Sequence, residues 1–187
     1  MRLGQEERSL SERDFLGGCA AQTEIDRRDT MSDSALREHV VNLLLGKGAH
    51  VEFDRVFDGI PYSVQGVRPE GASHTPWEIL EHMRIVQRDI LEFSRNPDHI
   101  SPEWPDGYWP EFDSPPIESL WKRQVDLFRD DLKAMIKLVK HPSSDLFTPF
   151  HYGRGQTLLR EALLVADHNA YHLGELVVVR RLLGTWE

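Results

Sequence analysis

Apolar side chains recur at helical spacing in four long segments of this chain, and no run of alternating apolar and polar residues separates the segments. In residues 79–93, every third or fourth residue is a large apolar one, which places these side chains on one face of an α-helix. Four amphipathic helices of roughly 20 to 27 residues can bury such faces against one another in a single bundle. The sequence therefore predicts an all-α fold, a four-helix bundle.

The second segment carries the clearest helix start. Thr75 can cap the helix, Pro76 suits its first position, and Glu78 completes a capping box, with the stripe continuing to Asn96-Pro97. Gly46 and Gly48 interrupt the first segment, where we expect a kink or a close helix contact, because a helical glycine costs roughly 1 kcal/mol relative to alanine. The remaining boundaries are Ser34 to Ile60 for the first segment, Ser114-Pro115 to His141-Pro142 for the third, and Thr157 to Leu183, before Gly184, for the fourth.

Residues 1–31 differ from the rest, since they mix charges of both signs with few large apolar residues. We expect a disordered N-terminal tail here, which contains the single cysteine, Cys19, and a bundle domain over residues 32–187. Organised periodicity begins directly after Met31, a candidate alternative start. The one cysteine excludes an internal disulfide.

The chain carries 22 Lys and Arg residues against 31 Asp and Glu, a formal net charge of −9. This acidic balance argues against nucleic acid as the main partner, since a phosphate backbone requires a basic face. No apolar run approaches the ~18 residues that a membrane span needs, and the N-terminus lacks the apolar core of a signal peptide. We therefore expect a cytoplasmic protein with no membrane partner.

A long loop rich in proline and tryptophan is predicted between the second and third helices, over residues 96–114. Loops of this length are often functional or act as lids. Trp104, Tyr108 and Trp109 could close over a substrate, or they could simply anchor the loop on the bundle.

His168 and His172 are the strongest candidates for chemistry among the nine histidines. Residues four apart lie on the same face of a helix, so both imidazoles can reach one metal ion at about 2.0–2.1 Å. His82 lies between Ile79 and Val86 in the apolar stripe of the second helix. A single buried histidine is more often a hydrogen-bonded core residue, but three on faces that point into the bundle predict a metal site.

Two better-known helical metal patterns are absent from the sequence. Asn169 follows His168, which excludes the zinc-protease H-E-x-x-H motif, and no Glu-x-x-His of the di-iron type occurs. The remaining interpretation is a mononuclear three-histidine site with open positions for water or substrate. Three imidazoles suit zinc, nickel, iron and manganese alike, so the identity of the divalent transition metal stays open.

Two stretches of the chain resemble the DinB-like superfamily, namely HTPWEILEHM at 74–83 and LLREALLVADHNAYHLGELVVVRRLLG at 158–184. The resemblance covers roughly residues 33–187 and implies a four-helix bundle related to the bacterial S-transferases that use bacillithiol or mycothiol. In that family a W-x-x-x-x-H histidine and an H-x-x-x-H motif bind a divalent metal, and the matching residues here are His82, His168 and His172. Members have been tied to metal-dependent thiol transfer and to maleylpyruvate isomerisation.

Four further residues have open roles. His50, beside the glycine break, could reach the site as an outer group or proton shuttle, or could be partly exposed at a kink. Glu175 could orient an imidazole or act as a base, or form a surface salt bridge. His74 is expected to make a local hydrogen bond, and His151 could line the mouth of the site.

These observations lead to two hypotheses of different class. The first is a metal-dependent enzyme with thiol S-transferase or hydrolase chemistry, acting on a small molecule with a low-molecular-weight thiol as cosubstrate; its catalytic residues beyond the metal ligands are unassigned. The second is a non-enzymatic, stress-linked bundle that binds a metal or a small ligand. A fourth protein ligand closing the site would favour the second. In either case we expect a homodimer.

Overall fold

The computed structural model describes residues 33–187. Residues 39–187 form one compact unit, which carries the elements discussed below; residues 1–38 form another, of which residues 33–38 are described and helical. The predicted tail over residues 1–31, with Cys19 and the candidate start at Met31, lies outside the described residues. The domain boundary at residue 32 stays a prediction.

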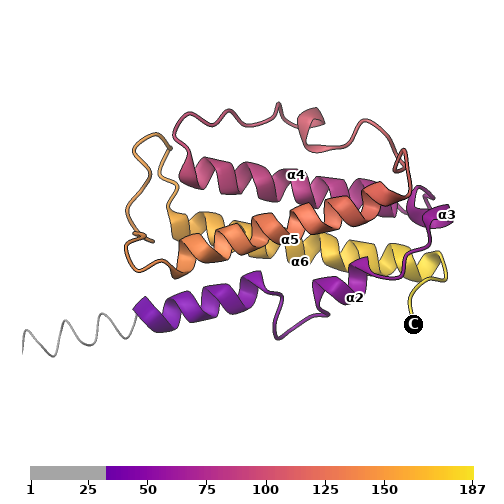
Figure 1. The fold of residues 1–187 in the computed structure, drawn as a ribbon, viewed down its shortest axis with the longest axis horizontal. Coiled ribbons are helices and arrows are strands. Elements are labelled where there is room, and N and C mark those ends of the chain that lie inside the picture. Colours follow the sequence, from indigo (N-terminus) through magenta and orange to yellow (C-terminus); the bar gives the residue numbers. More distant parts are fainter. Residues whose placement is uncertain (1–32) are drawn as a thin grey trace, which may run out of the picture. The chain divides into compact units, whose positions relative to one another are not determined.

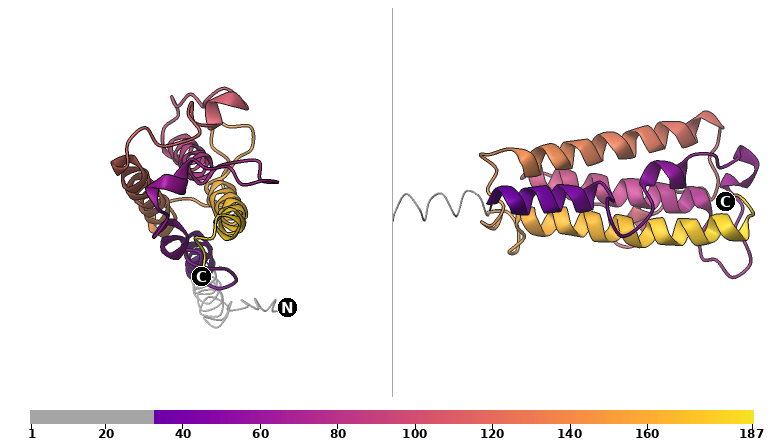
Figure 2. Two further views of the ribbon diagram at one scale, coloured as in Figure 1. Left: turned by 90° about the vertical axis from the view of Figure 1, so that its right-hand side faces the viewer. Right: turned by 90° about the horizontal axis from the view of Figure 1, so that it is seen from below.

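Three long helices make up most of the larger unit: α4 (Pro76–Arg95), α5 (Ser119–Lys140) and α6 (Leu158–Leu182). They lie side by side, and α4 packs against both α5 and α6 (Figure 1). The helical residues 39–44 run alongside these helices (Figure 2) and bury Val40, Val41 and Leu44. Every regular element among residues 33–187 is helical, which confirms the predicted all-α bundle.

The start of α4 is the capping box that the sequence predicted. The Thr75 hydroxyl oxygen accepts a hydrogen bond from the backbone N–H of Glu78 at 3.1 Å, and Glu78 Oε2 accepts from the backbone N–H of Thr75 at 2.7 Å. Both bonds satisfy donors that the first turn of a helix leaves open. The ends of α4 and α6 also confirm the prediction, since α4 stops at Arg95 and α6 is followed by Gly184.

The predicted continuity of the first segment is wrong. Its helix ends at Leu44, and after a loop the chain forms only two short helices, α2 (Phe53–Phe57) and α3 (Tyr62–Gln65). Gly46 and Gly48 have φ angles of 67° and 124°, a region that glycine enters without the steric cost of a Cβ atom. The chain therefore leaves the helix at this point instead of kinking.

The predicted start of the third helix is also wrong, because α5 begins at Ser119 and not at Ser114-Pro115. Pro115 precedes Pro116, and a residue before a proline is disfavoured in the helical conformation. Ile117, predicted in the buried stripe, is 57% exposed. The end of α5 at Lys140, before His141-Pro142, is as predicted.

Residues 96–118 form the long loop between α4 and α5, and they contain one 3₁₀ turn, η1 (Asp106–Tyr108). The loop runs along the outer side of α4 (Figure 1). Asp113 lies near the C-terminal end of this loop, and its carbonyl accepts a hydrogen bond from the Thr75 hydroxyl at 2.7 Å. The N-cap residue of α4 thus also holds the C-terminal part of the loop against the start of this helix.

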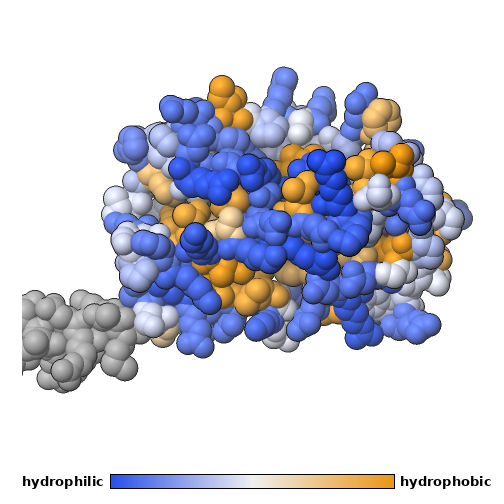
Figure 3. Space-filling model, in the orientation of Figure 1, coloured by the Kyte–Doolittle hydropathy of each residue, from blue (hydrophilic) through white to orange (hydrophobic). Residues whose placement is uncertain are grey.

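The face on which α5 lies is mostly hydrophilic, with apolar side chains showing between charged ones (Figure 3). A pocket of about 290 Å³ opens beside α5, and its apolar lining includes Leu45, Phe53, Phe128, Leu132 and Ile136. Within residues 33–187, no helix combines the length and the apolarity needed to cross a membrane.

Candidate metal centre

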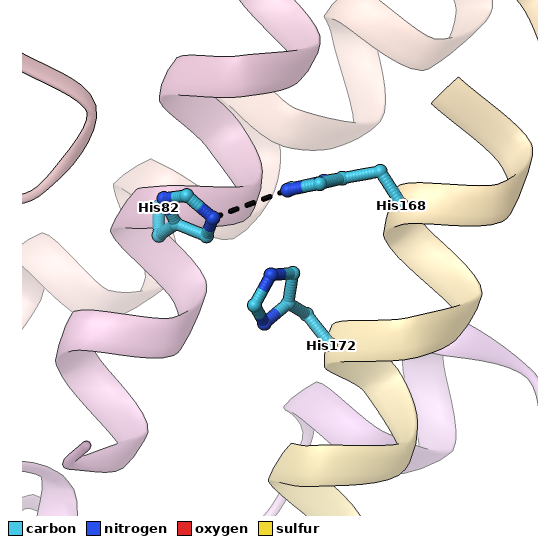
Figure 4. A group of neighbouring side chains, drawn as sticks. All are labelled: His82, His168 and His172. Carbon is cyan, nitrogen blue, oxygen red and sulfur yellow. Dashed lines mark hydrogen bonds between the residues drawn. The ribbon is translucent and has the colours of Figure 1, made fainter. Parts of the chain in front are cut away.

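Three histidines converge between α4 and α6 (Figure 4). His82 comes from the middle of α4, and His168 and His172 come from successive turns of α6. Nε2 of His82 lies 3.1 Å from Nε2 of His168, and one ring nitrogen of each histidine lies within 4.8 Å of the other two. The structure thus brings together the three residues that the sequence singled out. Their binding of a metal stays a prediction.

A buried pair of amides sets the register of the helices beside these histidines. Asn169 Nδ2 donates to Gln87 Oε1 at 2.8 Å, and Gln87 Nε2 donates to the carbonyl of Phe128 in α5 at 2.7 Å. Buried amides are costly when unpaired, so these bonds favour one alignment of the three helices. Because Asn169 directly follows His168, the same alignment helps to place His168 against His82. The sequence did not predict this pair.

The long loop orients His82. Nδ1 of His82 lies 2.8 Å from the carbonyl oxygen of Tyr108, and because a carbonyl only accepts, Nδ1 carries the proton. Nε2 of His82 is then unprotonated, and its lone pair faces His168. The indole of Trp109 stacks on the same imidazole, with centroids 3.9 Å apart and planes at 6°.

Glu175, one turn along α6, orients His172 in a similar way. Nδ1 of His172 donates to Oε2 of Glu175 at 2.8 Å, and Nδ1 of His74 donates to Oε1 at 2.8 Å. Burial raises the pKa of the Glu175 carboxyl, but the hydrogen bonds from the two histidines outweigh burial and hold the pKa below its usual value. In the neutral form of His172, this bond places the proton on Nδ1 and leaves Nε2 as the nitrogen with the free lone pair. The contact of His74 spans 101 positions, so the expected local hydrogen bond is wrong.

The protons of His168 are arranged differently. In the metal-free protein, Nε2 of His168 donates to the unprotonated Nε2 of His82. Nδ1 of His168 and Oδ1 of the adjacent Asn169 are both buried and lack a well-formed hydrogen bond among the described residues. An ion at Nε2 would displace its proton, and a proton on Nδ1 would then have the Asn169 side chain as its neighbour.

Burial favours the neutral form of two of the three imidazoles. It lowers the pKa of His168 to about 3, with a further contribution from the charges of His172 and His82. It also lowers the pKa of His82, in spite of the hydrogen bond to Tyr108. Because the neutral imidazole is the form that binds metals, burial favours the binding-competent charge state of His168 and His82 at neutral pH.

The donor set fits a divalent transition metal. Imidazole nitrogens bind such ions at about 2.0–2.1 Å, so two nitrogens on one tetrahedral ion lie about 3.3 Å apart. The 3.1 Å between the Nε2 atoms of His82 and His168 is close to this value. Among residues 33–187, no cysteine, carboxylate or further histidine joins the cluster of three. Three ligands would leave one position of a tetrahedral ion open for water or substrate.

Other candidates from the sequence lie in different places. Tyr108 and Trp109 anchor the loop on His82, whereas Trp104 is 75% exposed. His50 is exposed and contacts Val51 and Phe53, so it does not join the histidine cluster. His151 lies in an exposed turn, where its ring packs edge-on against that of Tyr152.

Asp89 is a second residue near these histidines that the sequence did not predict. Asp89 Oδ1 accepts from Nε2 of His99 at 2.7 Å, and Oδ2 accepts from the hydroxyl of Tyr108 at 2.8 Å. Burial and the Asp89 carboxylate raise the pKa of Tyr108 to about 12, so its hydroxyl remains a donor. Asp89 lies two helical turns after His82 on α4, and this spacing is the signal that could have identified it.

Comparison of the sequence with models of known protein families assigns the chain to a family. A family model described as the DinB superfamily matches residues 48–176, which is more than half of the chain and includes His82, His168 and His172. No curated protein and no solved structure matches the chain.

Proposed function

Since the chain belongs to the DinB superfamily, we propose that it is a metal-dependent enzyme in which His82, His168 and His172 hold one divalent transition metal ion. One observation carries this proposal. The carbonyl of Tyr108 and the carboxylate of Glu175 accept hydrogen bonds from the Nδ1–H groups of His82 and His172, which leaves the Nε2 lone pairs of these two histidines free for an ion. Outer hydrogen bonds of this kind orient the ligands in many metal sites.

The number of ligands supports a catalytic role over a structural one, because structural sites are usually closed by a fourth protein ligand. When bound, the ion would supply Lewis acidity and lower the pKa of a thiol or water at the open position. The chain's own groups hold the arrangement in place. Glu175 keeps His172 in the required tautomer, and the Trp109 indole shields one face of His82 from water.

We propose thiol transfer to an electrophilic small molecule as the reaction, with hydrolysis as the alternative reaction of the same site. The one cysteine, Cys19, lies outside the region that matches the family, so a low-molecular-weight thiol would have to bring the nucleophile. Its thiolate sulfur forms a bond to the electrophilic carbon, and the leaving group departs with the displaced electron pair. The proton of the thiol passes to the leaving group or to solvent.

The test is an assay of the purified chain loaded separately with Zn²⁺, Ni²⁺, Fe²⁺ or Mn²⁺. A panel of low-molecular-weight thiols is combined with a chromogenic electrophile, and an ester without thiol tests hydrolysis. We expect turnover above the background rate with at least one metal, its loss on chelation, and its recovery when the metal returns. His168→Ala is the matched control and should remain inactive with every metal. Turnover that survives chelation would contradict the proposal.

A non-enzymatic metal-binding bundle is the second candidate, and one observation favours it. Both oxygens of the Glu175 carboxylate are occupied by His172 and His74, so this acid is not free to act as a general base. This function predicts one bound metal ion and no turnover with any thiol or ester in the panel.

A further inference from the structure

Asp89 ties the long loop to α4 at a point two turns beyond His82. Its two oxygens accept from Nε2 of His99 at 2.7 Å and from the hydroxyl of Tyr108 at 2.8 Å. The Asp89 side chain is only 12% exposed, and both donors belong to the loop of residues 96–118. Hydrogen bonds to a carboxylate are stronger than those between neutral groups, so this part of the loop is firmly held.

The residue held by Asp89 is the one that orients His82. Tyr108 presents its hydroxyl to Asp89 and its carbonyl to Nδ1 of His82, each at 2.8 Å. Trp109 follows directly, and its indole stacks on the imidazoles of His82 and His74 at centroid distances of 3.9 and 4.1 Å. A displacement of Tyr108 and Trp109 would therefore remove both the acceptor and the stacking partner of His82.

We propose that Asp89 is a positioning residue of the histidine centre, which holds the Tyr108 carbonyl against His82 and so keeps Nε2 of His82 directed at His168 and His172. Without Asp89, Tyr108 can move, and Nδ1 of His82 loses its acceptor. The proton can then shift to Nε2, where it blocks a metal. The effect on metal affinity rests on the proposed function, whereas the effect on the His82 tautomer does not.

Tyr152 provides a matched comparison. Its hydroxyl donates to the carbonyl of Phe93 at 2.8 Å and so ties a different loop to the end of α4. Its ring packs against Phe93, Phe150 and His151, and within the described chain it makes no contact with the histidine centre. Tyr108→Phe and Tyr152→Phe each remove one hydroxyl that anchors a loop. Of these two tyrosines, Tyr108 is the one whose backbone carbonyl bonds His82.

The first measurement is the Kd for Zn²⁺, determined on the full chain by competition with a chromophoric chelator. Asp89→Ala and Tyr108→Phe should each weaken zinc binding roughly tenfold or more, the effect typical of groups that hold a metal ligand in place. Tyr152→Phe should bind zinc like the wild type. The double variant of Asp89 and Tyr108 should be no weaker than the weaker single variant, because both changes remove the same restraint.

The second measurement needs no metal. Long-range ¹H–¹⁵N NMR of the chelator-treated protein reports which imidazole nitrogen is protonated. In the wild type and Tyr152→Phe, His82 should carry its proton on Nδ1; in Asp89→Ala and Tyr108→Phe, both tautomers should be present. Unchanged zinc affinity and an unchanged His82 tautomer in those two variants would overturn the positioning role, as would an equal loss of zinc affinity in Tyr152→Phe. A wild type that binds no zinc contradicts the metal function instead, and the NMR comparison then decides the role of Asp89.

Discussion

Nε2 of His82 and Nε2 of His168 face each other at 3.1 Å, across 86 positions of the sequence. Only one proton can lie between them, and it belongs to His168, because His82 already uses its own proton to bond the Tyr108 carbonyl. A metal ion held by both nitrogens would have to displace that proton. Protons and metal ions therefore compete for the space between these two nitrogens. Metal binding should consequently depend on the pH and require both imidazoles.

Replacing His168 by alanine should remove most of the bound metal and leave the helices intact. The two remaining imidazoles make a poor site, whereas packing of the buried face of α6 holds the helix. Elemental analysis gives the metal-to-protein ratio, and circular dichroism gives the helical content. His151→Ala, a change outside the cluster, is the control and should retain the metal. Equal metal content in His168→Ala and the wild type would show that the predicted ligand set is wrong.

Glu175→Gln should raise the Kd for Zn²⁺ by about 10- to 100-fold, the usual effect of losing an outer hydrogen bond at a metal ligand. A carboxamide has one acceptor oxygen, so it cannot accept from both His172 and His74 as the carboxylate does. The matched control is Glu92→Gln, since Glu92 forms ion pairs with Arg88 and Arg95 on α4 and does not belong to the histidine cluster. Isothermal calorimetry measures both variants, and an equal affinity in Glu175→Gln and Glu92→Gln would contradict the orienting role.

Metal-free protein should lose stability as the pH falls below about 6.5. The folded-state pKa of His168 is about 3 and that of His82 is also lowered, against an ordinary value of 6.5. Between these values the unfolded chain binds more protons than the folded one, so the free energy of unfolding decreases with falling pH. This contribution is complete above about pH 6.5 and is lost towards pH 3. Melting temperatures measured with chelator from pH 8 to about pH 5 should show the slope.

The pH experiment has two comparisons. His168→Gln removes the buried imidazole and should flatten the slope, while added Zn²⁺ should steepen it in the wild type, because protons then also displace the metal. The range stops near pH 5 because burial raises the pKa of Glu161, a group whose contribution has the opposite sign. If the wild type and His168→Gln show identical slopes, the pH dependence of stability does not come from the lowered pKa of His168.

Asn169→Ala should destabilise the metal-free protein by about 1–3 kcal/mol, the usual cost of leaving a buried polar group without its partner. The change deprives Gln87 Oε1 of its donor between α4 and α6. Urea denaturation in the presence of chelator measures the free energy of unfolding without a contribution from metal binding. Asn96→Ala, which alters an exposed amide, should change stability by no more than about 0.5 kcal/mol. Similar losses in the two variants would argue against the register role of the Gln87–Asn169 pair.

The sequence by itself determined the helices and the three inner histidines. Helical periodicity, the capping box at Thr75, and the spacing of His168 and His172 are local features with the same geometry in any fold. His82 could be placed because its apolar neighbours must face the core. The prediction was wrong where a local property competes with periodicity, at the positive φ of Gly46 and at the consecutive prolines that precede α5.

Only the tertiary structure decided which groups hold the histidines in place. His74 reaches Glu175 across 101 positions, and the Tyr108 carbonyl reaches back 26 positions to His82. These contacts depend on the path of a long loop and on the alignment of α4 with α6, and packing of the whole unit sets both. Periodicity places an imidazole on a helix face, but its hydrogen-bonded partner determines which nitrogen is protonated. The direction of each Nε2 lone pair was therefore decided by the fold.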